Sequence, residues 1–108
     1  MNKLQELINS EKPTLIDFFA EWCGACHELE EKTYTNPEFV ELSTKFKLIK
    51  VDATQDNPET QKILAQFGVQ GLPTVLFINK KGEILKNLTF TQFIEWKDLK
   101  PKMQESLQ

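Results

Sequence analysis

TLIDFFAEWCGACHELEE, residues 14–31, is the stretch from which the fold of this sequence is predicted. It opens with an apolar run that is too short for a helix and rich in the large side chains of a buried strand. Cys23 and Cys26 follow, and the next residues, with Leu29 and Tyr34 among charged side chains, are typical of a helix. Cys23 is therefore predicted to lie where a strand passes into a helix N-terminus, whose free N–H groups and dipole stabilise a thiolate.

Cys23 and Cys26 form a C-x-x-C motif and are the only cysteines among the 108 residues. Cys26 is expected one helical turn after Cys23, where it can close a tight disulfide with it. Such a dithiol can cycle between reduced and oxidised forms. Because no other cysteine is available for a structural disulfide, the pair indicates chemistry rather than cross-linking, although it does not fix the cellular compartment.

Two segments resemble the thioredoxin superfamily. Residues 18–26, FFAEWCGAC, resemble its active-site segment, and residues 68–74, GVQGLPT, resemble its cis-proline loop. Residues 26–30 and 33–37 are most similar to the C-terminal periplasmic domain of the DsbD transmembrane thiol reductases. The resemblance implies an α/β thioredoxin fold in one domain over residues 1–108, with a central mixed sheet of four or five strands flanked by helices.

The pattern of strands and helices read along the chain has the same order, βαβαββα, which gives a parallel pair followed by an antiparallel hairpin. Strands are predicted at residues 14–19, 46–51, 74–78 and 83–88. A short first helix is predicted from the helical spacing of Leu4, Leu7 and Ile8. A final helix is expected to begin at Glu95 or Asp98 and to hold Pro101 in its first turn.

Two Asn-Pro pairs and one glycine predict further helix boundaries. Residues 36–37 should interrupt the active-site helix, after which a helical stripe resumes. Residues 57–58 should begin the next helix, with Asn57 as its N-cap and Pro58 at its first position. Gly68 is the expected end of that helix.

Cys23 is predicted to be the nucleophile, because it is nearer the helix N-terminus and is expected to be the more exposed of the two cysteines. Cys26 is predicted to be the shielded resolving thiol, which attacks the mixed disulfide that Cys23 forms with a partner. Two buried apolar cysteines without chemistry are the alternative interpretation.

Three charged residues are predicted to tune the dithiol. Asp17 lies in an apolar strand, and the resemblance implies a buried acid that assists deprotonation of the resolving cysteine, because desolvation raises the pKa of a carboxyl group. Lys50 matches a lysine that partners this acid in thioredoxins. Glu30 matches an acid near the active site of the DsbD domain, where it would raise the pKa of Cys23. The alternatives are a solvent-facing Asp17, a surface lysine and a solvated glutamate.

A substrate-binding surface is implied around the dithiol by the same resemblance. Pro73 is expected in the cis form, which leaves the backbone of Leu72 free to pair with an extended substrate segment. Trp22 is predicted to be a partly exposed lid beside Cys23, with core packing as the alternative. Gly24 and Ala25 complete the surface, and Ala25 stands where thioredoxins carry proline.

Two cofactor sites compete with this interpretation, and neither is favoured. A zinc site needs about four ligands, and the sequence offers only His27 beside the two cysteines. Residues 23–27 are formally C-x-x-C-H, a c-type haem attachment motif in which His27 would be an axial ligand and Met103 the distal candidate. A chain with at least four predicted strands is unlike a small helical cytochrome, so we expect no cofactor and no metal.

Composition limits the partners. A net charge of −3 argues against nucleic acid, and the longest apolar runs, such as residues 75–78, are too short for membrane insertion. The N-terminal residues 1–13, MNKLQELINSEKP, lack the apolar core of a signal peptide. Met1 is therefore either a cytoplasmic start or the start of a domain excised from a larger protein.

The sequence thus predicts a monomeric thiol–disulfide oxidoreductase that exchanges electrons with protein disulfides and dithiols. The DsbD-like features favour a reductive relay in the periplasm, fed by a transmembrane thiol reductase domain. A soluble cytoplasmic thioredoxin is the second hypothesis. A non-catalytic binding module with the thioredoxin fold is the third, and the presence of both cysteines disfavours it.

Overall fold

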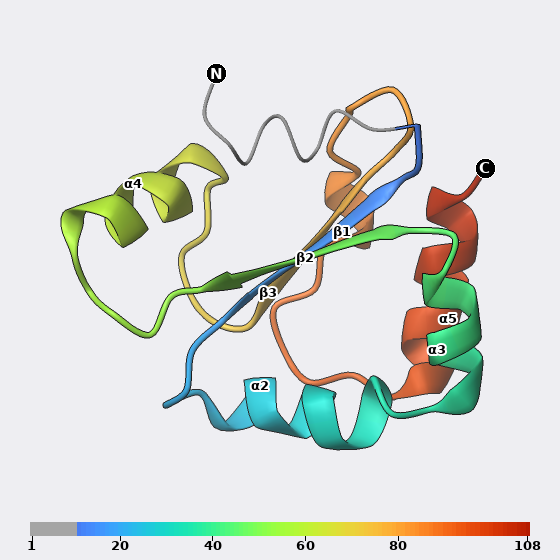
Figure 1. Cartoon of the computed structure of the whole chain (residues 1–108), viewed down its shortest axis with the longest axis horizontal. Coiled ribbons are helices and arrows are strands. Elements are labelled where there is room, and N and C mark those ends of the chain that lie inside the picture. The colour runs from blue at the N-terminus through green and yellow to red at the C-terminus, as the bar shows by residue number, and fades with distance from the viewer. Residues whose placement is uncertain (1–10) are drawn as a thin grey trace.

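A three-stranded mixed sheet lies at the centre of the computed structural model, which describes residues 11–108 (Figure 1). The strands are β1 (Thr14–Phe19), β2 (Lys47–Asp52) and β3 (Thr74–Ile78), in the order β2-β1-β3. β1 pairs with β2 in parallel and with β3 in antiparallel orientation, which confirms the mixed sheet. The short helix expected around residues 4–8 lies outside the described residues.

The central strand β1 is buried on both faces because its side chains alternate between two hydrophobic clusters. Ile16 and Phe18 point to one face, where they pack with Ile49 of β2. Leu15 points to the other face, where Asp17 also lies by the same alternation. A strand with an apolar run and two covered faces is what the opening segment predicts.

Helices cover the face of the sheet on which Leu15 lies. The chain leaves β1 through α2 (Gly24–Glu28), continues into the π-helical turn η1 (Leu29–Thr33), and then forms α3 (Pro37–Ser43). The C-terminal helix α5 (Trp96–Ser106) packs beside α3, as Figure 1 shows. Leu29, Phe39 and Met103 bring η1, α3 and α5 into one cluster with Leu15. No helix of residues 11–108 is long and apolar enough to cross a membrane.

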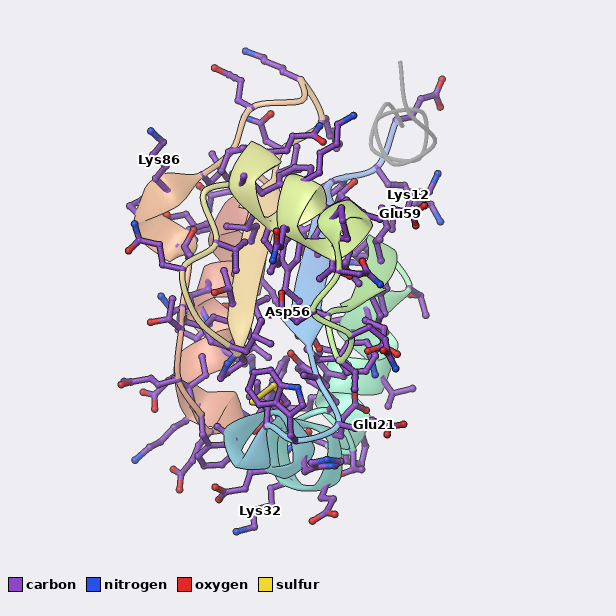
Figure 2. All side chains as sticks on the ribbon, turned by 90° about the vertical axis from the view of Figure 1, so that its left-hand side faces the viewer. Lys12, Glu21, Lys32, Asp56, Glu59 and Lys86 are labelled. Carbon is purple, nitrogen blue, oxygen red and sulfur yellow. A yellow bond between two sulfur atoms is a disulfide. The ribbon has the colours of Figure 1, made fainter. Side chains whose placement is uncertain are left out.

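The opposite face carries α4 (Pro58–Gln66), which lies in front of the strands in Figure 2. Its half-buried side chains Ile63 and Leu64 pack against the cluster of Ile16 and Phe18. The disulfide lies at the end of the molecule where Glu21 is labelled in the same view. The dithiol segment is thus placed at the edge of the core, where the strand β1 ends.

Residues 57–58 begin a helix as predicted, and residues 36–37 lie at the predicted interruption of the active-site helix, where α3 begins. Asn36 caps α3, with its side-chain oxygen accepting from the Glu38 N–H at 2.8 Å, and Pro37 is the first helical residue. Asn57 caps α4 in the same way through the Thr60 N–H at 2.9 Å. Gly68 follows the end of α4 with a φ of +66°, a conformation that glycine adopts without strain.

The expected fourth strand at residues 83–88 is wrong as a continuous strand. Only two isolated antiparallel bridges, Ile78 to Ile84 and Val75 to Phe90, pair this part of the chain with β3 among the described residues. Between them the chain folds into the 3-10 turn η2 (Lys86–Leu88). This turn buries Leu88 in the same cluster as Phe90 and leaves Lys86 exposed. A regular strand would place all three side chains on one face, because they are spaced two residues apart.

The predicted position of Pro101 in the first turn of the last helix is also wrong. α5 begins at Trp96 with Glu95 as its N-cap, which agrees with the earlier of the two predicted starts. The Trp96 ring packs edge-on against Phe39, with 6.0 Å between ring centroids, and its Nε1 donates to Glu38 at 3.0 Å. Pro101 therefore falls in the second helical turn, where it is exposed to solvent.

The dithiol site and its relatives

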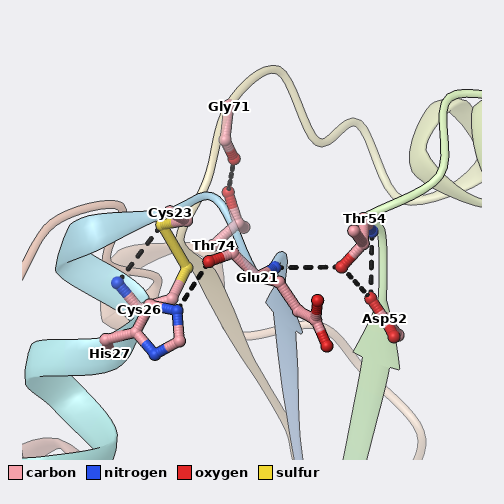
Figure 3. Close-up of a disulfide and its surroundings, with 8 residues drawn as sticks. All are labelled: Glu21, Cys23, Cys26, His27, Asp52, Thr54, Gly71 and Thr74. Carbon is pink, nitrogen blue, oxygen red and sulfur yellow. Dashed lines mark hydrogen bonds between the residues drawn. A yellow bond between two sulfur atoms is a disulfide. The ribbon is translucent and has the colours of Figure 1, made fainter.

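Cys23 and Cys26 form a disulfide at the start of α2, with 5.3 Å between their Cα atoms (Figure 3). Cys23 is the N-cap of the helix and has extended backbone angles, φ −93° and ψ 106°. Its Sγ accepts a hydrogen bond from the Cys26 N–H at 3.2 Å. A thiolate at Cys23 would face the same N–H and the positive end of the helix, and both lower the pKa of a thiol.

The two cysteine residues are almost equally buried in this oxidised form. Cys23 is 6% exposed and Cys26 is 4% exposed, so Cys23 is the more exposed by a narrow margin only. The pair packs with Ala20, and Ala25 and Leu72 cover it further. What separates the two cysteines is their position, because Cys23 precedes the helix and Cys26 lies within it.

The loop before β3 lies against the disulfide. The Leu72–Pro73 peptide bond is cis, as predicted, and Pro73 is buried while Leu72 packs against the cysteine pair. The Thr74 hydroxyl donates to the Gly71 carbonyl oxygen at 2.6 Å and holds the turn (Figure 3). The backbone of residues 71–72 is therefore presented beside the sulfur atoms.

Thr54 fixes the segment between β1 and the disulfide, and the sequence did not single it out. Its hydroxyl accepts from the Glu21 N–H at 2.9 Å, and its carbonyl oxygen accepts from the Trp22 indole at 3.2 Å. Asp52 accepts in turn from the Thr54 N–H at 2.9 Å (Figure 3). The available signal was Asp-x-Thr directly after a strand, a local pattern that hydrogen-bonds its own backbone.

Trp22 is 68% exposed, which excludes core packing for it. Its ring borders a groove of about 280 Å³ that runs past Thr54 to the cis-proline loop at Gly71 and Leu72. Gly24 is exposed, and a Cβ atom added there would meet nothing within 4 Å. The groove and the exposed start of α2 together leave room for an extended chain to lie across the disulfide.

His27 and Met103 do not form an axial ligand pair. The His27 Nε2 lies 2.6 Å from the Glu21 carbonyl oxygen, and since a carbonyl only accepts, Nε2 is the protonated nitrogen. Met103 is fully buried in the cluster around Leu15. Among residues 11–108, no group of three or more His, Cys, Asp and Glu side chains is placed to hold a metal ion.

Asp17, Glu30 and Lys50 are brought together on the sheet face beneath the helices. Asp17 and Lys50 are direct neighbours across β1 and β2 and point to the same face. Lys50 pairs with Glu30 of η1, and its Nζ also lies 4.7 Å from the centre of the Phe19 ring. Asp17 is only 4% exposed, so a solvent-facing acid at this position is excluded.

Burial raises the pKa of Asp17 from 3.8 to about 6. The positive charge of Lys50 opposes this shift and lowers the pKa, whereas the negative charge of Glu30 raises it. The Tyr34 hydroxyl lowers the pKa of Asp17 more weakly, although the Asp17 Oδ1 and the hydroxyl oxygen each lack a partner at hydrogen-bond distance. A carboxyl group that titrates near pH 6 can take up and release a proton close to neutrality.

Comparison with known proteins identifies the family. The thioredoxin family model matches residues 2–105. The chain is 36% identical to the thiol:disulfide interchange protein DsbD of Campylobacter jejuni strain RM1221, a match that covers 93% of this chain and 17% of that protein. It is 33% identical to DsbD of Haemophilus ducreyi, over 79% of this chain and 16% of that protein. The chain therefore spans about a sixth of the length of these curated relatives.

Solved structures lead to the same family. The oxidised C-terminal domain of DsbD from Neisseria meningitidis superimposes with a TM-score of 0.77 at 26% identity, covering 88% of this chain and 80% of that one. The thioredoxin of Fasciola hepatica shares the fold, with a TM-score of 0.73 at 24% identity over 95% of this chain and 90% of that one. With the family model matched over residues 2–105, the chain belongs to the thioredoxin family.

Proposed function

We propose that this chain is a thiol–disulfide oxidoreductase domain that passes electrons by dithiol–disulfide exchange. The observation that carries the proposal is the Cys23–Cys26 disulfide at a helix N-terminus, packed against the cis Leu72–Pro73 loop. The similarity to DsbD proteins supports it. On this proposal residues 1–108 act as one domain and need no cofactor, since the sulfur atoms carry the electrons.

The exchange runs in two steps. In the reduced protein, the Cys23 thiolate attacks one sulfur of a partner disulfide, which forms a mixed disulfide and releases a partner thiolate. The Cys26 thiolate then attacks the Cys23 sulfur, closes the Cys23–Cys26 disulfide and releases the second partner thiolate. Two electrons pass to the partner, and the two released thiolates take up the protons that the cysteines lost.

Asp17 is the proposed proton acceptor for Cys26. It lies buried on the face that α2 and η1 cover, and its pKa of about 6 suits it to exchange a proton near neutral pH. Burial is the main cause of this raised pKa, which Lys50 lowers and Glu30 raises. Glu30 adds negative charge near the dithiol and so disfavours the Cys23 thiolate until a partner docks.

The partner is proposed to bind as an extended segment across the disulfide. The backbone at Leu72 and Pro73 pairs with it, and Trp22 borders the groove that receives it. Gly24 and Ala25 form the part of the surface at the start of α2. The absence of a side chain at Gly24 lets the partner backbone approach the Cys23 sulfur closely.

The similarity to DsbD suggests the direction and location of the exchange. We propose a monomeric domain on the periplasmic side, reduced by a transmembrane thiol reductase domain and oxidised by periplasmic proteins. The likeness to DsbD over a sixth of that protein's length supports this placement. Neighbouring membrane-spanning sequence in the full-length gene product would support it, and a gene that encodes only this chain without an export signal would favour a cytoplasmic thioredoxin instead.

Insulin reduction with dithiothreitol as the electron source tests the function. The wild-type chain should accelerate reduction, and Cys23→Ser should abolish the acceleration because the nucleophile is lost. Cys26→Ser should also stop turnover but accumulate a mixed disulfide on Cys23, visible by mass spectrometry and released by reductant. Equal trapping on Cys26 in the Cys23→Ser variant, or faster alkylation of Cys26 than of Cys23 in the reduced protein, would contradict the assignment.

A further inference from the structure

Two buried polar atoms close to the Asp17 cluster have no partner within hydrogen-bond distance. They are the Oδ1 atom of Asp17 and the hydroxyl oxygen of Tyr34. Both residues line one cavity of about 160 Å³ between β1, β2 and η1, which Glu30 and Lys50 also line. Unpaired buried polar atoms are uncommon, and two that share a cavity point to an interaction across it.

The fold holds the Tyr34 ring in place independently of its hydroxyl group. The Tyr34 N–H donates to the Leu29 carbonyl oxygen at 2.8 Å, which closes the wide turn η1. The ring stacks on Phe39, with 4.9 Å between centroids and 24° between planes. Glu30 lies four residues earlier, one turn of the same helical segment, so both side chains face the cavity. Stacking on Phe39 accounts for an aromatic side chain at position 34, but it does not require the hydroxyl group.

We propose that Tyr34 is a positioning residue for Asp17, whose carboxyl group its hydroxyl orients across the shared cavity. Both side chains line this cavity, together with Glu30 and Lys50. The hydroxyl would donate to the Asp17 carboxylate and favour its ionised form. This inference rests on the proposed function, because it concerns the proton exchange assigned to Asp17.

Among residues 11–108, three charged or titratable groups act on the pKa of Asp17 in the oxidised protein, namely Lys50, Glu30 and Tyr34. Lys50 of β2 favours the ionised form, and Glu30 of η1 opposes it. Tyr34 acts in the same direction as Lys50. Val75, beside Asp17 in the sheet, and Phe39, at the cavity wall from α3, are apolar. Removal of the hydroxyl alone should therefore move the pKa of Asp17 upward.

Tyr34→Phe tests the proposal, because it removes the hydroxyl and keeps the ring that stacks on Phe39. The pKa of Asp17, followed by carbon NMR of its carboxyl group in the oxidised protein, should rise by roughly one pH unit. An unchanged pKa of Asp17 in Tyr34→Phe would overturn the proposal and leave Tyr34 as a packing residue. This titration needs no exchange activity, so its outcome is separate from the insulin assay that tests the proposed function.

A double-variant comparison separates an effect through Asp17 from a general effect on the dithiol. In the wild-type background, Tyr34→Phe should shift the pH profile of exchange upward with the pKa of Asp17. In an Asp17→Asn background, the same change should leave the pH profile unmoved. A shift of equal size in both backgrounds would contradict the assignment. Tyr34→Leu, which removes ring and hydroxyl together, should lower stability, whereas Tyr34→Phe should not.

Discussion

Asp17 shows how strongly a single position in the fold changes the chemistry of a residue. Its neighbours in β1 are apolar, and its carboxyl group is removed from water on the face beneath α2 and η1. Burial disfavours the charged form, so the folded protein keeps a proton on Asp17 at pH values where the unfolded chain has lost it. The raised pKa that supports the proposed proton exchange by Asp17 therefore lowers the stability of the fold at neutral pH.

The sign of this stability effect leads to a prediction for Asp17→Asn. Because the pKa of Asp17 is raised from 3.8 to about 6 in the folded state, its contribution to stability is present below pH 3.8 and is lost as the pH rises through about 6. At pH 7 the variant should be more stable than the wild type, by on the order of 2 kcal/mol. The difference should vanish near pH 4. Urea unfolding at a series of pH values measures it.

The wild type serves as the internal control in this comparison. Glu38 and Asp52 have lowered pKa values, Glu38 chiefly through its bond from Trp96 and Asp52 through its bonds from Thr54. Their contributions are lost as the pH falls, but they are the same in both proteins and cancel in the difference. If Asp17→Asn is equally stable or less stable than the wild type at pH 7, burial of the charged Asp17 does not destabilise the folded protein.

At the scale of residues, functional side chains could be predicted from the sequence where the residue type differs from that of its neighbours in the chain. Cys23 and Cys26 stand out in any chain, and Asp17 stands out in an apolar strand. Tyr34 and Thr54 do not, because a hydroxyl among polar residues gives no signal until the sheet brings it beside its partner. The Tyr34 hydroxyl meets the cavity of Asp17 only after η1 has packed over β1.

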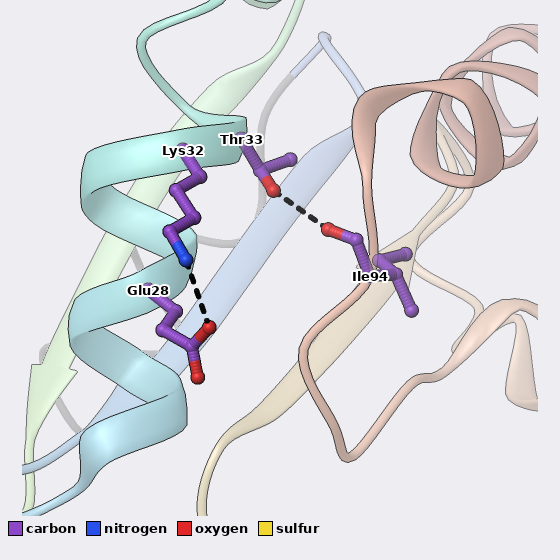
Figure 4. A network of polar contacts seen from close by, with 4 residues as sticks. All are labelled: Glu28, Lys32, Thr33 and Ile94. Carbon is purple, nitrogen blue, oxygen red and sulfur yellow. Dashed lines mark hydrogen bonds and ion pairs between the residues drawn. The ribbon is translucent and has the colours of Figure 1, made fainter.

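At the scale of elements, η1 connects the dithiol helix to the rest of the molecule. Thr33 at its end is buried, and the Thr33 hydroxyl donates to the Ile94 carbonyl oxygen at 2.6 Å (Figure 4). This bond joins the end of the active-site helix to the irregular segment that precedes α5. The same view shows the ion pair of Lys32 and Glu28, whose Nζ and Oε2 atoms lie 3.3 Å apart. Both side chains are exposed to solvent, so the pair is expected to contribute little to the stability of the fold.

The contact between Thr33 and Ile94 predicts a matched pair of variants. Thr33→Val keeps the side-chain shape but leaves the Ile94 carbonyl without this donor, which should lower the free energy of unfolding by about 1–2 kcal/mol. Thr35→Val is the control, because its hydroxyl bonds the Glu31 carbonyl within the same exposed segment. The control should stay within about 0.5 kcal/mol of the wild type. Both free energies of unfolding can be measured by chemical denaturation. If the two variants lose the same amount, the hydrogen bond from Thr33 to Ile94 does not stabilise the fold.

Elements with a clear hydrophobic period were predictable, and those shaped by tertiary packing were not. β1 and β3 have the predicted bounds because each is a short apolar run between turn residues. The segment after β3 alternates like a strand, yet it turns at η2, which leaves Lys86 exposed while Leu88 and Phe90 are buried in the core. The π-helical form of η1 likewise has no sequence signature, because its wide turn depends on packing against the sheet.

At the scale of the whole molecule, the charges around the dithiol bear on the direction of electron flow. Oxidants of this fold owe their high potentials to a very stable thiolate in the reduced form. Here the helix N-terminus favours the Cys23 thiolate, whereas Asp17 and Glu30 add negative charge on the same side of the sheet. Lys50 acts on both acids, but its single positive charge offsets only one of the two negative charges. This balance favours the disulfide form and predicts a reductant.

Equilibration of the protein with a glutathione redox buffer measures the reduction potential of the Cys23–Cys26 pair and tests this central claim most directly. The control is Asp17→Asn, which should make the protein more oxidising because one negative charge is removed. The wild type should have a potential nearer to about −270 mV, the value of thioredoxin, than to about −120 mV, the value of DsbA. A potential above roughly −180 mV, in the range of protein disulfide isomerase, would contradict the account of a reductive relay.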